Sequence, residues 1–122
     1  MNDAQNTNRR KFDLEERTTE FAKQVVRLCK TFPQNSINSR INGQVVGSAG
    51  SIGANYREAN DALGKKDFTH RLKISRKEAK ETIYWLELAK ESNPESGIQI
   101  DPLIQEASEL KNILSAIIIK SQ

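Results

Sequence analysis

Residues 43–60 read GQVVGSAGSIGANYREAN, with glycine at positions 43, 47, 50 and 53. Such a stretch is typical either of a phosphate-binding loop or of a helix surface that another helix approaches closely. The dinucleotide fingerprint is G-x-G-x-x-G after a strand, whereas this stretch contains G-x-x-G-x-x-G and no strand is predicted before it. The phosphate-loop signature G-x-x-x-x-G-K-[ST] is not met at Gly64-Lys65-Lys66 either. The stretch therefore predicts a helix.

On this helix the apolar residues between Ile41 and Ala59 recur at helical spacing, which predicts a face buried in a core. Small residues form a second stripe almost opposite. Each glycine inside a helix costs roughly 0.5–1 kcal/mol relative to alanine, so we interpret this stripe as a close contact with a helix of another subunit. The alternative is a kinked helix whose glycines face solvent. The stripe consists of Gly43, Gly47, Gly50 and Ala54.

Four helical segments and no strands are predicted, because prolines occur only at positions 33, 94 and 102, between periodic stretches. The first segment runs from about Leu14 to Thr31, with Asp13 as its cap. The second covers about 37–63, and the third begins after Gly64 and extends to about Ser92. The fourth is predicted to start at Asp101-Pro102. Short connections favour an all-α, antiparallel up-down-up-down four-helix bundle, with one domain at 12–120 and a disordered tail at 1–11.

Composition narrows the class of protein. The 122 residues are 36% hydrophobic and 29% charged, with a net charge of +3, which suits a helical bundle with narrow apolar stripes. A single cysteine, Cys29, excludes an internal disulfide and is predicted to be a buried thiol. No apolar run is long enough for a membrane span or a signal peptide, so we expect a soluble, cytoplasmic protein.

Charge is unevenly distributed along the chain. Residues 65–80 contain seven Lys or Arg against two acids, whereas residues 91–110 contain five acids and no base. On the third helix the bases form a line that is either a solvated face or a contact to nucleic-acid phosphates. The candidate nucleic-acid-binding residues are Lys66, His70, Lys73, Lys77 and Lys80, flanked by Arg71 and Arg76.

A third line on the same helix lies between its core and basic faces. It contains Ile74, Trp85 and Leu88. Apolar side chains beside a charged face indicate a subunit contact, with Trp85 as its anchor.

Catalysis and metal binding have little support in the sequence. His70 is the only histidine, which excludes a di-iron bundle with two Glu-x-x-His pairs and a two-histidine zinc site. Asn55, Arg57 and Glu58 form a polar group in the second helix, for which we expect pairing with neighbouring helices. We predict no catalytic residue, cofactor or metal.

Three runs carry a family resemblance: Ser51–Ala59 (SIGANYREA), Lys65–Phe68 (KKDF) and Ala79–Leu86 (AKETIYWL). They resemble the bacterial four-helix-bundle proteins called 23S ribosomal RNA intervening-sequence proteins, and the resemblance covers nearly the whole chain. It implies a left-turning antiparallel bundle, commonly assembled as a homopentameric ring. The family is similar to the accessory variability determinant protein of diversity-generating retroelements, a basic pentamer that binds nucleic acid and a reverse transcriptase.

One departure from the family pattern bears on these expectations. Members commonly carry Leu-Arg-Arg or Leu-Arg-Ser where this chain has Val45, Val46 and Gly47. The missing arginine weakens the case for nucleic-acid binding, and the same change adds a glycine to the small-residue stripe. We therefore expect a non-enzymatic homo-oligomer, a pentamer as the resemblance implies, with RNA or DNA as its partner. The alternative is a scaffold for a reverse transcriptase or another protein, without nucleic-acid binding.

Overall fold

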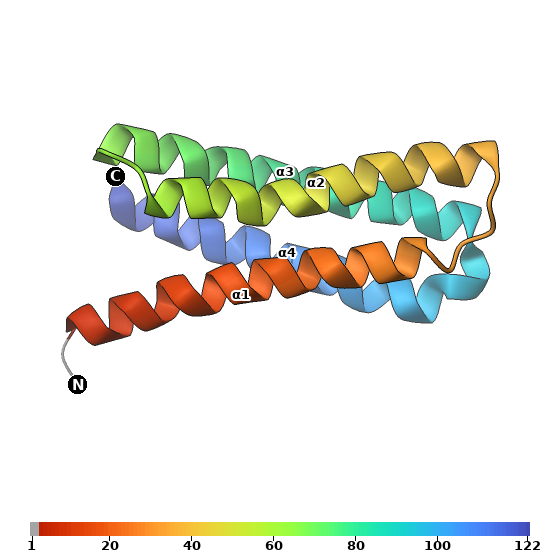
Figure 1. Cartoon of the computed structure of the whole chain (residues 1–122), viewed down its shortest axis with the longest axis horizontal. Helices are drawn as coiled ribbons and strands as arrows, with labels where there is room; N and C mark the ends of the chain where they lie inside the picture. Colours follow the sequence, from red (N-terminus) through yellow and green to blue (C-terminus); the bar gives the residue numbers. More distant parts are fainter. Residues whose placement is uncertain (1–2) are drawn as a thin grey trace.

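A computed structural model describes residues 3–122 of the chain, with side chains from Asp13 onward. Each of four helices runs antiparallel to the next: α1 (Asp3–Cys29), α2 (Ser36–Asn60), α3 (Lys65–Ser92) and α4 (Gly97–Ser121). A short 3₁₀ turn, η1 (Pro94–Ser96), joins the last two. Figure 1 shows the up-down-up-down order, with both ends of the chain at the same end of the bundle. The predicted fold class is confirmed.

Two predicted helix starts are wrong. Residues 3–12 contain no glycine or proline, so α1 continues through Asp13 and that residue does not cap it. Asp101-Pro102 lies inside α4, which starts at Gly97 directly after η1. Pro102 cannot donate to the Ile98 carbonyl, but both residues are exposed to solvent, which limits the cost of the lost bond.

The predicted disorder of residues 1–11 stays a prediction. Residues 1 and 2 lie outside the described part of the chain, and α1 takes in residues 3–11. The expected start of the second helix is close to the observed one. Asn35 caps α2, because its side chain accepts a hydrogen bond of 2.8 Å from the backbone N–H of Asn38.

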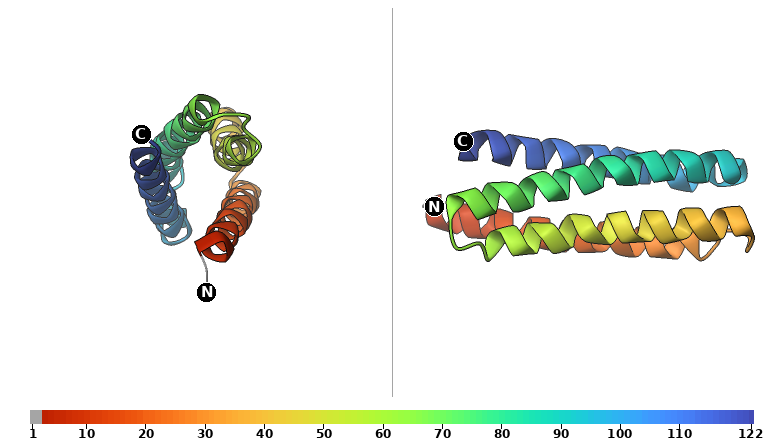
Figure 2. Two further views of the ribbon diagram at one scale, coloured as in Figure 1. Left: turned by 90° about the vertical axis from the view of Figure 1, so that its left-hand side faces the viewer. Right: turned by 90° about the horizontal axis from the view of Figure 1, so that it is seen from above.

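The core lies along the axis of the bundle and receives a stripe from each helix. The view along the axis in Figure 2 shows the helices in the cyclic order of the chain, with α1 and α4 at the open side. The contact between α2 and α3 is the most extensive and that between α1 and α4 the least. Side chains with no exposed surface include Phe21, Ile52, Leu72, Leu86 and Leu110.

Cys29 is buried among these residues, as predicted. Burial raises the pKa of its thiol to about 11, so the thiol stays protonated at neutral pH. This protonation keeps Cys29 an unreactive apolar group of the core.

Candidate nucleic-acid interface

The predicted basic line lies on the outer face of α3. The opposite face of the helix is buried through residues such as Leu72, Ala79 and Leu86, which fixes the rotation of α3 and turns the lysines outward. Within the described side chains, no carboxylate lies within ion-pair distance of any residue of the line. All five of its residues, Lys66, His70, Lys73, Lys77 and Lys80, are exposed.

The two flanking arginines lie on opposite sides of α3, one facing α2 and the other facing α4. Arg71 leans toward α2, where its Nη1 donates to Asn55 Oδ1 at 3.4 Å, and its Nε lies 4.0 Å from Asp67. Arg76 leans toward α4 and donates to Ser115 Oγ at 3.5 Å. Both are half-buried. The structure therefore brings the five residues together in one line and holds the two arginines at its edges.

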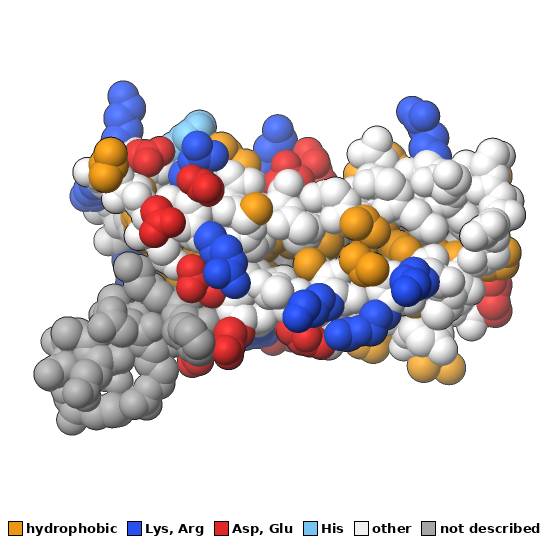
Figure 3. Space-filling model, viewed as in Figure 1, with side chains coloured by type: hydrophobic (Ala, Val, Ile, Leu, Met, Phe, Trp, Pro, Cys, Tyr) orange, Lys and Arg blue, Asp and Glu red, His pale blue; other side chains and the backbone are white. Residues whose placement is uncertain are grey.

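At its first turn the basic line borders a hollow. Lys65, Lys66, His70 and Lys73 line it, together with Ser121 at the end of α4. The single histidine marks this region in pale blue at the upper edge of Figure 3, where the outer face of α3 turns away from the viewer. Positive charge is thus concentrated at the end of the bundle where α3 begins.

The small-residue stripe of α2 is uncovered. Gly43, Gly47, Gly50 and Ala54 are all exposed. A Cβ atom added to any of the three glycines would meet no atom within 4 Å. These glycines therefore make no close contact within their own bundle, and the surface is open to another molecule.

The apolar line of α3 is partly covered by its own bundle. Ile74, Trp85 and Leu88 are half-buried, and the last two pack against the core. Ile74 follows Arg71 by three residues and so lies on the side of α3 that faces α2. The ring of Trp85 also packs edge to face with Tyr84, at 5.4 Å between ring centroids. Because α2 and α3 are neighbours, the stripe and the apolar line border the same outer surface.

Two residues of the polar group of α2 pair with neighbouring helices, as expected, and the third does not. Arg57 donates to Thr19 Oγ1 at 3.1 Å and lies 3.8 Å from Glu15, both on α1. Asn55 accepts from Arg71 of α3. Glu58 is exposed and makes no hydrogen bond with a described side chain.

Sequence reasoning missed the glycine that does support a close contact. Gly53 is buried, and a Cβ atom there would lie 2.8 Å from Thr18 Oγ1 of α1. It also missed two buried asparagines, Asn38 and Asn93, whose amides donate to each other at 2.9 Å. The only available sign was their place at helix ends beside Pro33 and Pro94.

The described residues were also compared with the requirements of a metal site and of a membrane span. The described side chains contain no group of three or more His, Cys, Asp or Glu that is able to hold a metal ion. None of the described helices has the length and apolarity to cross a membrane.

Two comparisons with known proteins agree with each other. A family model described as 23S rRNA-intervening sequence protein matches residues 10–116. A crystal structure of a protein with unknown function from the S23 ribosomal protein family of Bacteroides thetaiotaomicron VPI-5482 is 33% identical and has a TM-score of 0.76. The match covers 86% of this chain and 97% of that one. No curated protein matches the chain.

These findings confirm the resemblance that the run SIGANYREA indicated. Neither match points to an enzyme family. The kinship with the accessory variability determinant protein stays a prediction.

Proposed function

The chain belongs to the 23S rRNA-intervening sequence protein family, and we propose that it is a cytoplasmic, non-enzymatic adaptor that associates with nucleic acid. In this proposal five copies form a ring. The outer face of α3 in each copy contacts backbone phosphates of RNA or DNA.

The exposed basic line of α3 is the observation that carries the proposal. Its lysines have no carboxylate partner among the described side chains, so their ammonium groups are free to neutralise phosphates. Among the described side chains of α3, Tyr84, at the far end of the line, is the only exposed aromatic residue apart from His70. A surface rich in lysine and poor in stacking groups favours contacts to the backbone over contacts to bases.

Assembly into a ring would multiply this weak contact. One line of five basic residues binds weakly at physiological salt, whereas several lines on one particle bind with a gain from effective concentration. The uncovered small-residue stripe of α2 and the half-buried Trp85 support an interface on the neighbouring surface of α2 and α3. In this arrangement the basic line stays free beside the interface.

Electrophoretic mobility shifts with structured RNA and with duplex DNA, at low and high salt, test the nucleic-acid contact. We expect the double variant Lys73→Glu/Lys77→Glu to lose binding at least tenfold. The matched control is Lys23→Glu/Lys30→Glu, which makes the same charge change at exposed positions of α1 and of the turn that follows it. No shift at low salt, or an equal loss in the control, would show that the α3 line is only a solvated face.

Light scattering tests the interface. Gly47→Leu and Trp85→Ala are each expected to reduce the mass of the particle, while Asn112→Leu, an exposed position of α4, is expected to leave it unchanged. Particles of wild-type size from both interface variants would contradict the assignment of these residues. A mass of one chain for the wild type would contradict the ring.

The second candidate function is a protein-interaction scaffold without nucleic-acid binding. Two exposed valines favour it: Val26 of α1 and Val46 of α2 are 41% and 36% exposed. Figure 3 shows apolar side chains gathered between these helices, with basic ones along α1. Purification after nuclease treatment separates the two functions, because a protein partner that is retained without nucleic acid supports the scaffold.

A further inference from the structure

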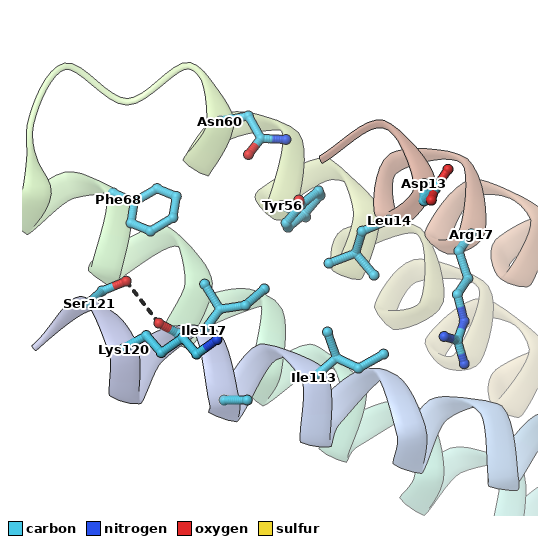
Figure 4. A pocket seen from close by; sticks show the side chains of 11 residues that line it. Asp13, Leu14, Arg17, Tyr56, Asn60, Phe68, Ile113, Ile117, Lys120 and Ser121 are labelled. Carbon is cyan, nitrogen blue, oxygen red and sulfur yellow. Dashed lines mark hydrogen bonds between the residues drawn. The ribbon is translucent and has the colours of Figure 1, made fainter. Parts of the chain in front are cut away.

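A cavity of about 530 Å³ opens between α1 and α4 at the end of the bundle that holds both chain ends. Its walls come from all four helices, as Figure 4 shows. The volume falls within the range of roughly 300–1,000 Å³ that small-molecule sites span. The lining residues used below are Leu14, Tyr56, Phe68, Ile113, Ile117 and Lys120.

The cavity exists because α1 and α4 diverge toward this end (Figures 1 and 2). Farther along, α1 is tied to α4 by Arg17, which lies 2.7 Å from Glu106. Toward the chain ends, apolar side chains remain uncovered. Phe68, Ile113 and Ile117 pack against the core on one side and are still partly exposed. Apolar surface left facing water in a concave site favours the binding of an apolar body.

The two ends of the cavity differ in charge. Figure 4 shows Lys120 beside Ile117 and Ser121, toward the same end as Phe68, and Asp13 and Arg17 at the other end. The guanidinium of Arg17 is already engaged by two carboxylates of α4, so Asp13 leaves that end acidic. Lys120 makes no ion pair with any described carboxylate.

The basic end is reinforced by the start of α3. Ser121, which lines the cavity, also borders the hollow formed with Lys65 and Lys66. Lys120 lines the cavity itself and two further ammonium groups line the adjacent hollow, so the potential on this side favours an anionic group.

We propose that this cavity binds one free amphipathic molecule with an unbranched aliphatic body and a single anionic head. The body lies between Leu14, Tyr56 and Ile117, and the head lies at Lys120. The residues that line the cavity itself include none of the basic line of α3, so this inference does not depend on the proposed nucleic-acid contact.

Isothermal titration calorimetry with dodecanoate, below its micelle concentration, tests the site. We expect one molecule bound per chain and an affinity at least tenfold higher than that of dodecyltrimethylammonium, which has the same body and a cationic head. Lys120→Glu is expected to weaken dodecanoate roughly tenfold and to strengthen the cationic analogue, because an exposed side chain changes sign at the head position.

Cavity filling provides the matched pair of variants. Ile117→Trp fills the cavity and is expected to abolish binding of dodecanoate, while Ile119→Trp, two residues later on the exposed face of α4, is expected to retain it. Circular dichroism and thermal unfolding establish that both variants fold. Should Ile117→Trp fail to fold, Ala116→Phe fills the cavity from an exposed position of its rim.

Three results would overturn the inference. One is no heat of binding with dodecanoate, and another is an equal affinity for the anionic and cationic heads. The third is a combined result: the wild type does not bind dodecanoate, and Ile117→Trp lowers the mass of the particle in light scattering. That result would make the cavity an interface covered by a second copy.

Discussion

The contact between α2 and α3 and the contact between α1 and α4 are built by different means. Between α2 and α3, buried hydroxyl groups link the helices at two levels. Ser75 Oγ donates to the carbonyl of Ile52 at 2.7 Å, and Thr82 Oγ1 lies 2.9 Å from Ser48 Oγ. Small buried side chains let the backbones approach, and each of these three hydroxyls has a hydrogen-bond partner.

The contact between α1 and α4 has no such buried links among the described residues. Its main polar tie is the two-point pair of Arg17 and Glu106, with both hydrogen bonds at 2.7 Å. These side chains are 38% and 25% exposed. Beyond the pair the helices separate around the cavity.

We infer from this difference that the α2–α3 side and the α1–α4 side of the bundle have different roles. Helices α2 and α3 form a rigid unit that carries the small-residue stripe and the basic line. Helices α1 and α4 meet loosely, and local opening is expected there first, because few buried contacts must be broken. A ligand site is compatible with that side and a fixed assembly surface with the other.

The largest expected effect comes from the amide pair that closes the α2–α3 contact. Asn38 and Asn93 exchange two hydrogen bonds of 2.9 Å, and both are 1% exposed. Asn38→Leu leaves the amide of Asn93 buried without its partner, which is expected to cost about 2–4 kcal/mol in the free energy of unfolding. Urea unfolding at a fixed protein concentration measures this loss.

The double variant Asn38→Leu/Asn93→Leu checks the cause. Because it removes both amides, its cost is expected to fall below the sum of the two single costs by at least ~1 kcal/mol. The exposed Asn112→Leu is the control, with an effect within about 0.5 kcal/mol. Strict additivity would mean that the two amides do not depend on each other.

The second effect concerns how α1 is attached to α2. At Gly53 an added Cβ would lie 2.8 Å from Thr18 Oγ1 and 3.2 Å from its Cβ. Thr18 is buried and its hydroxyl donates to the backbone carbonyl of Glu15, so the side chain has little freedom to move. Gly53→Ala is therefore expected to destabilise the fold by about 1–2 kcal/mol, as measured by thermal unfolding.

The control for this prediction is Gly50→Ala, on the open stripe of the same helix. It is expected to stabilise the fold by about 0.5–1 kcal/mol, since alanine is the better helix former. Adding Thr18→Ala to Gly53→Ala is expected to restore part of the loss. Equal gains at both glycines would refute the close contact of α1 with α2.

The third effect is at the α1–α4 contact. Arg17→Met removes the pair with Glu106 and is expected to cost about 0.5–1 kcal/mol, since a half-exposed pair is worth little. The pKa of Arg17 is raised, mainly by its hydrogen bond to Glu106 and against desolvation, so its charge persists at any accessible pH. The cost is expected to shrink in high salt.

Arg27→Met is the matched control, because Arg27 pairs with Glu20 within α1 and crosses no contact between helices. It is expected to leave the unfolding midpoint unchanged. Hydrogen exchange adds a second measurement. Amides of α1 are expected to exchange faster in Arg17→Met, while those of α2 and α3 are not. Uniform acceleration would contradict the view of α1 as a separately opening edge.

The sequence predicted the architecture because each helix carries a regular apolar stripe and prolines punctuate the chain. It also predicted that the basic line and the small-residue stripe face outward, since both lie opposite a core face. The positions of helix starts at Asp3 and Gly97 were not predictable in this way. Cap signals such as those at Asp13 and Asp101 compete with the tendency of an unbroken helix to continue.

The sequence did not distinguish Gly53 from the other glycines. Spacing gives the direction in which a residue points, and Gly53 points toward α1, but the distance between two helices depends on both surfaces. The amide pair of Asn38 and Asn93, 55 residues apart, and the cavity are likewise products of how the helices meet. Contacts of this kind leave no local pattern.

The smallest expected effect lies at the outer edge of the α2–α3 contact and depends on pH. Burial, and then the carboxylate of Glu81, raise the pKa of Glu78 above its usual value, against an opposite influence of Lys77. The folded state thus favours protonated Glu78. Its contribution to stability is fully present below the unfolded pKa and is lost as pH rises through the raised folded pKa. Glu78→Gln is therefore expected to raise the free energy of unfolding at pH 7 by less than about 0.5 kcal/mol, seen as a higher thermal midpoint, and to change nothing at pH 4. Glu87→Gln, exposed on the same helix, serves as the control.

A lower midpoint of Glu78→Gln at pH 7 would mean that the carboxylate is held as an anion, and that the α2–α3 contact has an ionic tie at its edge after all.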